Sequence, residues 1–401
     1  VPGRVRILIA KVIFQNNVRA MRNEPDRIPA AYADNRTDRI LAEIEVARRM
    51  GVEVFVLDTG WYEKTGDWAV SRPRFPDGLK AVTAKLAGAG MKLGLWFNPT
   101  VAALTSKMRT DHQDCVMSWN GKPHPPQAIW ETEESQGLCL VSRYADSFAD
   151  ELIRLHRELG VSYFKWDAIG QYGCDAPGHF HGGPEHSPKE RSDRYAYLQP
   201  QFMGRIVDRL AASCPEAMVD FDITETGRSV GLSFLASGKY FIINNGPYNF
   251  NLDFPQDLHN MGINMYVRPG PARTWVGRTA LPYDSWIPSI LFLTHYLPDD
   301  PKESQEVNLA SLILGQNGIW GDLLSMSEDG IGRFARTLAL YKQVRDDITA
   351  APPVRSGRIG GSPEIHEKIN PANGRGAVVA FATQAGSYPY ATVRSVDSRV
   401  S

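Results

Sequence analysis

Short apolar runs alternate with segments of helical spacing along most of this chain, and this alternation constrains the fold more than any other feature. The apolar runs predict strands at 5–14, 52–58, 92–97, 137–142, 162–169, 217–224, 239–245 and 317–322. Helical spacing and stop signals predict helices at 38–50, 79–89, 145–159, 192–213, 285–297, 303–315 and 329–344. Eight strands separated by helices favour an α/β fold, a parallel (β/α)8 TIM barrel, over an open doubly wound sheet.

Two segments depart from this alternation. Residues 101–136 are rich in His, Pro and Trp and predict a long irregular insertion. Beyond about residue 350 the texture changes to Pro, Gly and short β-like runs such as 376–383. We therefore expect two domains, a (β/α)8 barrel over 1–350 and the start of a small C-terminal all-β domain over 351–401.

Composition excludes several classes of partner. Among 401 residues, 43% are apolar and 22% charged, and the net charge of -1 argues against nucleic acid or a charged membrane as partner. No apolar run reaches the roughly 18 residues of a membrane span. The four cysteines are widely spaced and form no disulfide framework. No signal-peptide pattern is present and the chain starts at Val1 rather than Met, so we assign no compartment. The oligomeric state stays open, a homo-oligomer included.

Residues 162–169 predict a buried strand that ends in an acid. Successive side chains on a strand point to opposite faces, so Tyr163, Lys165 and Asp167 share one face, and Phe164 and Trp166 the other. A Lys and an Asp on one face of an apolar strand are costly to bury unless they meet each other or a ligand. A structural ion pair and a binding site are both compatible with this pattern.

Polar and aromatic residues gather where the predicted strands end, which is where barrels carry their chemistry. They are Asp58, Trp61, Trp96, Asn98, Asp167, Asp220, Asp222, Thr224, Asn244, Trp320 and Asp322, with Trp68 in the turn after the second strand. Carboxylates bind hydroxyls and aromatic faces stack on the C–H surfaces of sugar rings. Any one tryptophan can equally belong to the core, but the set predicts a sugar site.

At this point the residues resemble a family. Five blocks carry the resemblance: Val-Leu-Asp-Thr-Gly-Trp (56–61), Gly-Asp-Trp (66–68), Arg-Phe-Pro-Asp-Gly-Leu-Lys (74–80), Gly-Met-Lys-Leu-Gly-Leu-Trp (90–96) and Phe-Lys-Trp-Asp (164–167). In order and spacing they are similar to the α-galactosidases of glycoside hydrolase family 36, over roughly residues 35 to 345. The resemblance implies a retaining α-glycosidase on a (β/α)8 barrel, with a small β-domain after the barrel.

The resemblance also implies roles for single residues. Asp167 matches the nucleophile, Lys165 a ligand of a sugar hydroxyl, Asp58 the first of two sugar-binding acids, and Trp68 a platform for the ring. The sequence departs from the family at other positions. Thr59 replaces the family's second sugar-binding acid. Ile169 replaces the Asn that follows the nucleophile by two residues, and Asn244 replaces the Asp that acts as acid and base.

A further departure lies in the loop after the sixth predicted strand. The family's Cys-Ser-x-Gly-Gly-Gly-Arg stretch is Asp222-Ile223-Thr224-Glu225-Thr226-Gly227-Arg228 here. We expect Thr224, Glu225 and Arg228 to contact substrate, together with Trp61 and Trp96. These departures leave galactose specificity open.

The proton donor is the main open question, because an amide such as that of Asn244 cannot donate a proton to a leaving alkoxide. A retaining glycosidase needs two carboxyls about 5–5.5 Å apart. The best substitute is Asp222, on the strand predicted to lie next to that of Asp167, about 4.8 Å away. Glu225 is the second choice, and Asp222 can instead bind a sugar hydroxyl.

The run from Cys174 to His181 combines cysteine, aspartate and histidine side chains. Cys174, Asp175, His179 and His181 offer ligand types that zinc accepts. Their spacing matches no common structural zinc site, and the Gly and Pro content favours a loop that shapes the pocket. We therefore expect no metal and no organic cofactor.

These patterns together predict a glycoside hydrolase that acts on an oligosaccharide or glycoside with an α-linked, galactose-like sugar, with Asp167 as nucleophile. Two alternatives remain from other classes. One is a non-catalytic carbohydrate-binding barrel that kept the pocket and lost the acid. The other is a Schiff-base lyase that uses Lys165, since a buried Lys with a lowered pKa can attack carbonyls.

Overall fold

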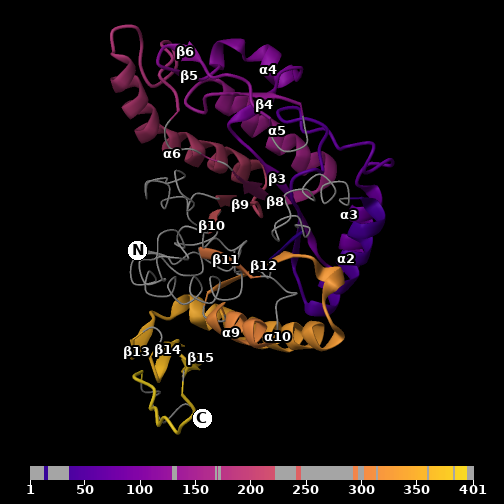
Figure 1. The fold of residues 1–401 in the computed structure, drawn as a ribbon, viewed down its shortest axis with the longest axis vertical. Helices are drawn as coiled ribbons and strands as arrows, with labels where there is room; N and C mark the ends of the chain where they lie inside the picture. Colours follow the sequence, from indigo (N-terminus) through magenta and orange to yellow (C-terminus); the bar gives the residue numbers. More distant parts are fainter. Residues whose placement is uncertain are drawn as a thin grey trace. The chain divides into compact units, whose positions relative to one another are not determined.

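The computed structural model describes most of the chain between residues 36 and 394 (Figure 1). The described ranges are 36–128, 133–167, 169, 173–221, 302–312, 315–358, 361–382 and 384–394, together with the strand backbones of 13–16, 241–244 and 292–296. The chain forms two compact units, one of residues 15–45 and 54–242 and one of residues 1–14, 46–53 and 243–401.

The described elements alternate as an α/β fold. The helices are α2 (Thr37–Met50), α3 (Lys80–Gly88), α4 (Lys107–Asp111), α5 (Tyr144–Leu159), α6 (Pro188–Ser213), α9 (Lys302–Leu312) and α10 (Glu328–Ala350), with 3₁₀ turns at Gln113–Cys115 and Leu323–Ser325. The main strands are β1 (Ile13–Asn16), β2 (Val54–Leu57), β3 (Lys92–Phe97), β8 (Val161–Trp166), β9 (Met218–Phe221), β10 (Phe241–Asn244), β11 (Phe292–Tyr296) and β12 (Gln316–Gly321). None of the helices in these ranges combines the length and apolar character that a membrane crossing requires.

The strand order is that of a closed barrel, β1-β12-β11-β10-β9-β8-β3-β2. Residue-level registers define two parallel arcs of this order. In one arc β2 pairs with β3, β3 with β8 and β8 with β9. In the other, β10 pairs with β11 and β11 with β12. The sequence predicted the α/β class, and the structure confirms it.

Two of the predicted elements were wrong. The apolar run 137–142 is no barrel strand, because only its first residue belongs to a strand, β7 (Ser135–Gly137), which pairs antiparallel with β4 (Val101–Ala103). The segment 285–297 was predicted as a helix, yet its described part is the strand β11. The strand that carries Lys165 is therefore fourth along the chain among those of the barrel order, between β3 and β9.

The insertion after β3 is more regular than its sequence indicates. It contains β4 and β7, helix α4, and a small hairpin of β5 (Ser118–Trp119) and β6 (Lys122–Pro123). Figure 1 shows α4, β4, β5 and β6 grouped near α5, in the same compact unit. The insertion thus consists of short regular elements that belong to this unit.

Strand β8 has two faces with different partners, as its period of two predicted. On the outward face, the Trp166 ring lies 5.5 Å from that of Phe148 in α5 and 5.2 Å from that of Phe221 in β9. Gly160 caps the C-terminus of α5. Its φ of 71° and the hydrogen bond from its backbone N–H to the His156 carbonyl end the helix just before β8 starts. The tight αL turn therefore sets where the strand begins.

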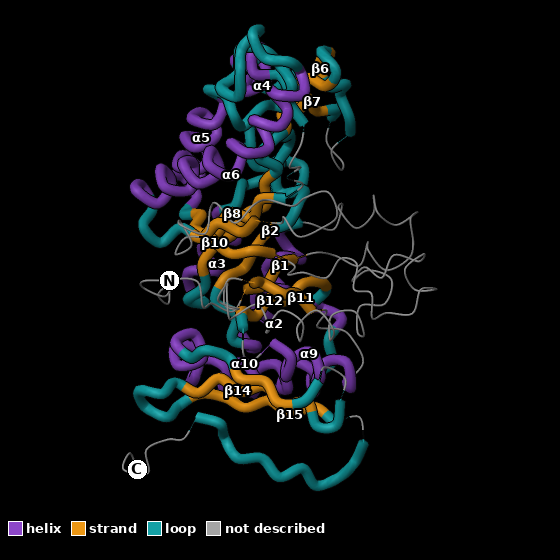
Figure 2. The backbone as a smooth tube through the Cα atoms, turned by 90° about the vertical axis from the view of Figure 1, so that its left-hand side faces the viewer, coloured by secondary structure: helices purple, strands orange, loops and turns teal. Residues whose placement is uncertain are grey.

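The C-terminal residues form a three-stranded antiparallel sheet. Its strands are β13 (Val354–Ser356), β14 (Glu364–Ile369) and β15 (Gly376–Phe381). Figure 2 shows α10 along one face of this sheet. The Asp347 carboxylate of α10 accepts hydrogen bonds from the side-chain amides of Asn370 at 3.1 Å and Asn373 at 2.7 Å. The described part of 351–401 is thus β-rich, and the predicted domain boundary at residue 350 stays a prediction.

Gly94 is a position in β3 where the barrel wall leaves no room for a side chain. A Cβ at this position would lie 2.7 Å from Val56 Cγ2 and 3.0 Å from Tyr163 Cβ. We expect Gly94→Ala to lower the free energy of unfolding by about 1–3 kcal/mol, because neighbouring strands must shift to accept it. Chemical denaturation measures this. Gly88→Ala in α3 is the control, since its Cβ would meet nothing within 4 Å and Ala favours helix. Equal stabilities of the two variants would contradict the close approach.

Candidate functional site

Asp58, Lys165 and Asp167 meet at the carboxyl ends of β2 and β8. The Lys165 ammonium lies 3.3 Å from Asp58 Oδ2 and 3.9 Å from Asp167 Oδ2. Asp58 and Lys165 are buried, and the Asp167 side chain is 13% exposed. The Asp167 backbone N–H bonds the Phe97 carbonyl, which continues the β3–β8 pairing up to this residue. The structure thus brings together the three charged residues that the sequence placed in one pocket.

Trp96 orients the Asp167 carboxylate. Its indole N–H donates to Asp167 Oδ2 at 2.9 Å. On the other side, the carbonyl of Trp96 accepts the indole N–H of Trp61 at 2.9 Å. One oxygen of Asp167 is therefore held between an indole donor and the Lys165 ammonium, which stabilises the ionised carboxylate in a fixed orientation.

Asp220 of β9 is one of the polar residues that the sequence placed at the strand ends, but it was given no role of its own there. It is fully buried, pairs in register with Lys165, and accepts the Tyr163 hydroxyl on Oδ2 at 2.5 Å. Burial raises the pKa of Asp220 from its ordinary value to about 7; Tyr163 and Lys165 oppose the rise, and Asp167 and Asp58 add to it. The sequence did not predict that Asp220 pairs with Tyr163 and Lys165, although the period of two had placed those two residues on one face.

The titration of Asp220 predicts a pH-dependent stability. Because its pKa is higher in the folded than in the unfolded protein, its stabilising contribution is complete below the unfolded value, 3.8, and is lost as pH rises through about 7. Asn cannot titrate, so the unfolding free energy of wild type should fall relative to that of Asp220→Asn, by about 2–3 kcal/mol between about pH 5 and pH 8. Denaturant titrations at both pH values measure this, with the exposed Asp208→Asn as control. Parallel pH profiles for wild type and Asp220→Asn would contradict the shift.

The tryptophans form a packed aromatic cluster beside the carboxylates. Trp61 and Trp68 stack with ring centroids 6.2 Å apart, and both are fully buried. Tyr62 stacks on Trp96 at 5.7 Å and meets Trp68 edge-on at 4.9 Å. In these described contacts Trp68 serves as a core residue against Tyr62 and Phe97. Its role as a platform for a sugar ring stays a prediction.

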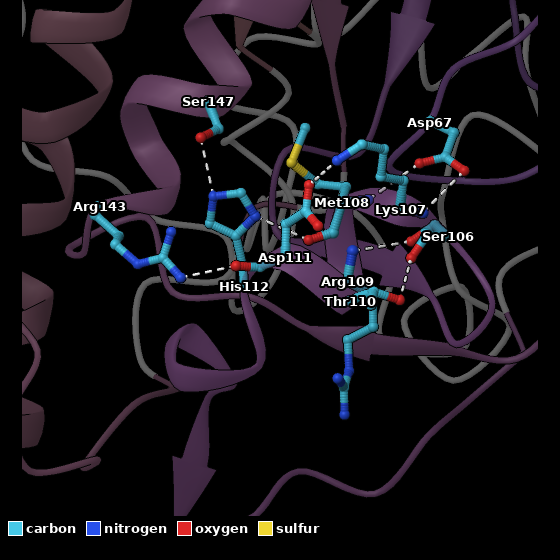
Figure 3. Close-up of polar contacts among 10 residues, drawn as sticks. All are labelled: Asp67, Ser106, Lys107, Met108, Arg109, Thr110, Asp111, His112, Arg143 and Ser147. Atoms are coloured by element: carbon cyan, nitrogen blue, oxygen red, sulfur yellow. Dashed lines mark hydrogen bonds and ion pairs between the residues drawn. The ribbon is translucent and has the colours of Figure 1, made fainter.

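The turn that carries Trp68 is fixed from outside by Asp67. Figure 3 shows the Asp67 carboxylate accepting the backbone N–H groups of Lys107 and Met108, at 3.1 Å each, at the start of α4. At the other end of α4, His112 bonds the Met108 carbonyl at 2.8 Å and Ser147 of α5 at 2.9 Å. The insertion therefore ties the turn after β2 to α5 through short polar contacts.

Five of the predicted site residues cannot be placed from their side chains. Asp222, Thr224, Glu225 and Arg228 lie outside the described residues, and of Asn244 only the backbone, as the last residue of β10, is described. Their predicted contacts with substrate stay predictions. The described part of the site is thus Asp58, Trp61, Trp68, Trp96, Lys165 and Asp167, with Tyr163 and Asp220 added.

The described charges suit the binding of a polar ligand. The carboxylates of Asp58 and Asp167 flank the ammonium of Lys165, and the buried acid Asp220, whose pKa is raised to about 7, lies on the neighbouring strand in register with Lys165. Asp167 is the most exposed of the four and lies at the end of its strand, so it can reach a ligand. A fixed, ionised carboxylate at such a place can serve as a nucleophile or stabilise positive charge.

A second cluster of side chains, whose atoms could bind a metal ion, lies in the loops of the same unit. Cys139, Cys174, His179 and His181 are all buried, and their ligand atoms lie within 4.8 Å of one another. Asp175, which the sequence grouped with them, is engaged elsewhere. Its carboxylate accepts the Ser118 hydroxyl at 2.5 Å and the Gly121 backbone N–H at 3.1 Å. The sequence missed Cys139 because it lies in the run that was predicted as a strand.

Comparison with known proteins gives a consistent family. The model of the family described as Melibiase matches residues 5–227, more than half of the chain. The α-galactosidase Mel36A of Lactobacillus acidophilus is 29% identical over 146 residues, which cover 34% of this chain and 19% of that protein. The chain thus matches only about a fifth of the length of this curated relative.

Solved structures give the same fold. The GH36 α-galactosidase AgaB from Geobacillus stearothermophilus is 18% identical with a TM-score of 0.63, over 92% of this chain and 46% of that one. A variant of AgaA from the same organism, in complex with raffinose, is 17% identical with a TM-score of 0.57, over 89% of this chain and 45% of that one. At these sequence identities the likeness supports a shared fold alone.

Proposed function

Because the chain belongs to the melibiase family, we propose that it is a glycoside hydrolase that cleaves α-linked, galactose-like sugars with retention of configuration, on a (β/α)8 barrel followed by a C-terminal β-domain. The names of its relatives support this proposal, since Mel36A is an α-galactosidase. Raffinose, bound in the AgaA structure, indicates an oligosaccharide as the class of substrate.

One observation carries the proposal, the placement of Asp167 beside Lys165 and Trp96. The indole N–H of Trp96 and the Lys165 ammonium hold one carboxylate oxygen, at 2.9 and 3.9 Å. A carboxylate held in this way is ionised and oriented, as attack on an anomeric carbon requires. Asp167 is accordingly the nucleophile of the proposal, and bond cleavage forms a covalent glycosyl-enzyme that water then hydrolyses.

In this proposal the other charged residues of the site bind the sugar hydroxyls. Asp58 accepts from hydroxyl donors, and Lys165, paired with Asp58 at 3.3 Å, donates to a hydroxyl oxygen. Trp61, Trp68 and Trp96 form the aromatic side of the site, and Thr224, Glu225 and Arg228 complete it from the loop after β9.

Asp222 is the proposed acid and base. It follows Asp220 by two residues, and the period of two along a strand assigns both to one face. Register supports this choice, because Asp220 pairs with Lys165 on the neighbouring strand, two residues before Asp167. Asn244, at the family's acid position, has no proton to give at neutral pH.

Two other functions have less support. A lyase with Lys165 as nucleophile needs a neutral amine, whereas this amine is paired with Asp58 and Asp167, which favour the ammonium. A non-catalytic sugar-binding barrel could use the same oriented carboxylate to bind a hydroxyl, but the relatives that the chain resembles are named as α-galactosidases, which favours the enzyme.

A panel of aryl glycosides tests the proposed function. We expect the protein to release phenolate from aryl α-galactosides, with aryl β-galactosides and aryl α-glucosides as matched controls that stay intact. The first sugar released should be the α-anomer, as proton NMR of the fresh reaction mixture reports. A β-anomer would contradict retention, and binding of galactose without cleavage of any aryl glycoside would favour the sugar-binding barrel.

A further inference from the structure

Cys139, Cys174, His179 and His181 converge from two loops of the unit that holds the charged site. All four side chains are buried, and the two thiol sulfurs and the ring nitrogens lie within 4.8 Å of one another. We propose that these residues bind a structural zinc ion, with two sulfur and two nitrogen ligands. The proposal is independent of the glycosidase chemistry, because no ligand belongs to the charged site.

The size and chemistry of the cluster match a zinc ion. Zn–S bonds of about 2.3 Å and Zn–N bonds of about 2.0–2.1 Å in a tetrahedron put ligand atoms about 3.4–3.8 Å apart. The observed upper limit of 4.8 Å needs only a small contraction to reach that spacing. Two thiolates and two neutral imidazoles form a closed, four-ligand set that suits a structural rather than a catalytic role.

His179 is oriented as a metal ligand would be. Its Nε2 donates to the backbone carbonyl of Asp114 at 2.9 Å, and its Nδ1 lies 3.4 Å from Cys174 Sγ. The bond to the carbonyl places the proton on Nε2 and leaves the lone pair of Nδ1 aimed into the cluster. Metal-bound histidines regularly anchor their second nitrogen in this way.

His181 supplies an independent observation. The residue is fully buried, and neither ring nitrogen makes a hydrogen bond of ordinary geometry with the residues that the structure describes; its polar neighbour is the Cys174 thiol of the same cluster. Its ring packs at 5.6 Å against that of Tyr195 in α6 and at 5.4 Å against that of His179. A buried imidazole that lacks a well-formed hydrogen bond is costly, and a metal bond to one nitrogen lowers that cost.

Backbone hydrogen bonds hold both loops in place around the cluster. The Cys139 N–H bonds the Cys115 carbonyl at 2.9 Å, and the Phe180 N–H bonds the Val141 carbonyl at 3.0 Å. Arg191 of α6 donates to the carbonyl of Asp175. The ligands therefore sit on a preformed frame that needs little rearrangement to bind an ion.

Zinc at this position would join two segments that follow neighbouring strands. Cys139 lies between β7 and α5, in the segment that connects β3 to β8, and the other three ligands lie in the loop after β8, which begins at Asp167. The ion would thus link the loop that follows Asp167 to the segment between β7 and α5.

Metal content tests the proposal on the whole chain. Protein made in zinc-supplemented medium should hold about one zinc per chain by elemental analysis. X-ray absorption at the zinc edge should show two sulfur neighbours at about 2.3 Å and two nitrogens at about 2.0–2.1 Å. After exchange for Co²⁺, thiolate-to-cobalt charge-transfer and tetrahedral ligand-field bands should appear. These measurements use wild type, so they do not depend on a variant that folds.

Variants then assign the ligands. Cys139→Ala and His181→Ala should each lose the tetrahedral cobalt spectrum and most of the zinc, with a lower Tm. Cys214→Ala is the matched control, because Cys214 is also a buried thiol beside a histidine, His156 at 3.0 Å, but lies outside the cluster. It should keep both spectrum and zinc. The proposal is overturned if folded wild type holds little zinc and gives no tetrahedral cobalt spectrum, or if Cys139 and Cys174 are joined in a disulfide on peptide mapping.

Discussion

Asp167→Asn is expected to lower kcat/KM on aryl α-galactosides by about 10⁴–10⁶-fold, the scale on which loss of a nucleophile acts in other enzymes. Asn keeps the size of Asp and can still accept the Trp96 indole N–H, so the fold should persist. It cannot form the glycosyl-enzyme ester. Circular dichroism and Tm separate this loss from unfolding, and Asp150→Asn, an exposed acid of α5, is the control that should retain full activity.

Covalent labelling locates the same nucleophile without a variant. A 2-fluoro galactosyl fluoride should inactivate wild type, and peptide mapping should find the sugar on Asp167. A label on any other acid, or turnover by Asp167→Asn near that of wild type, would contradict the assignment. A label on Asp220 would be the most informative alternative, because this buried acid pairs in register with Lys165, two residues before Asp167.

Asp222→Ala is expected to slow cleavage of raffinose-type and alkyl α-galactosides by about 10²–10⁴-fold, the usual worth of general acid catalysis. Aryl galactosides with very good leaving groups need no proton, so the burst of phenolate that reports formation of the glycosyl-enzyme should persist. Stopped-flow absorbance measures that burst, and a plot of rate against leaving-group pKa should become steep for the variant only.

Asn244→Asp is the partner experiment. With Asp222 as the acid, adding a carboxyl at position 244 should leave the dependence on the leaving group unchanged. A large gain on natural substrates would instead show that wild type lacks its acid. If neither substitution alters the leaving-group dependence, a third group must donate the proton.

Residue patterns grouped charged residues that the structure holds close together, because this grouping depends on local geometry. The period of two put Tyr163, Lys165 and Asp167 on one face of a strand, and the structure has Lys165 between Asp58 and Asp167. The predicted helix at 145–159 is α5, where apolar spacing and the glycine at 160 both act locally. The roles of these residues in catalysis stay predictions.

Errors arose where tertiary contacts override a local pattern. Residues 137–142 are apolar enough for a barrel strand, and Leu138 and Val141 are indeed fully buried. Yet the Leu138 N–H bonds the Thr100 carbonyl, within the insertion, rather than a barrel strand. A short apolar run does not reveal which backbone will pair with it. For the same reason the sequence did not predict that Cys139 lies near Cys174, because residue spacing does not show which distant segments meet in the fold.

The two-faced character of β8 has a consequence for how sequences of this kind can diverge. Trp166 packs outward against Phe148, while Lys165 and Asp167 point to the charged site. A single inserted or deleted residue before Lys165 would turn every later side chain to the opposite face. The charges would then meet the aromatic layer under α5, and the indole would enter the site. Point substitutions in this strand change one partner at a time, but a change in its length by one residue reverses its two faces together.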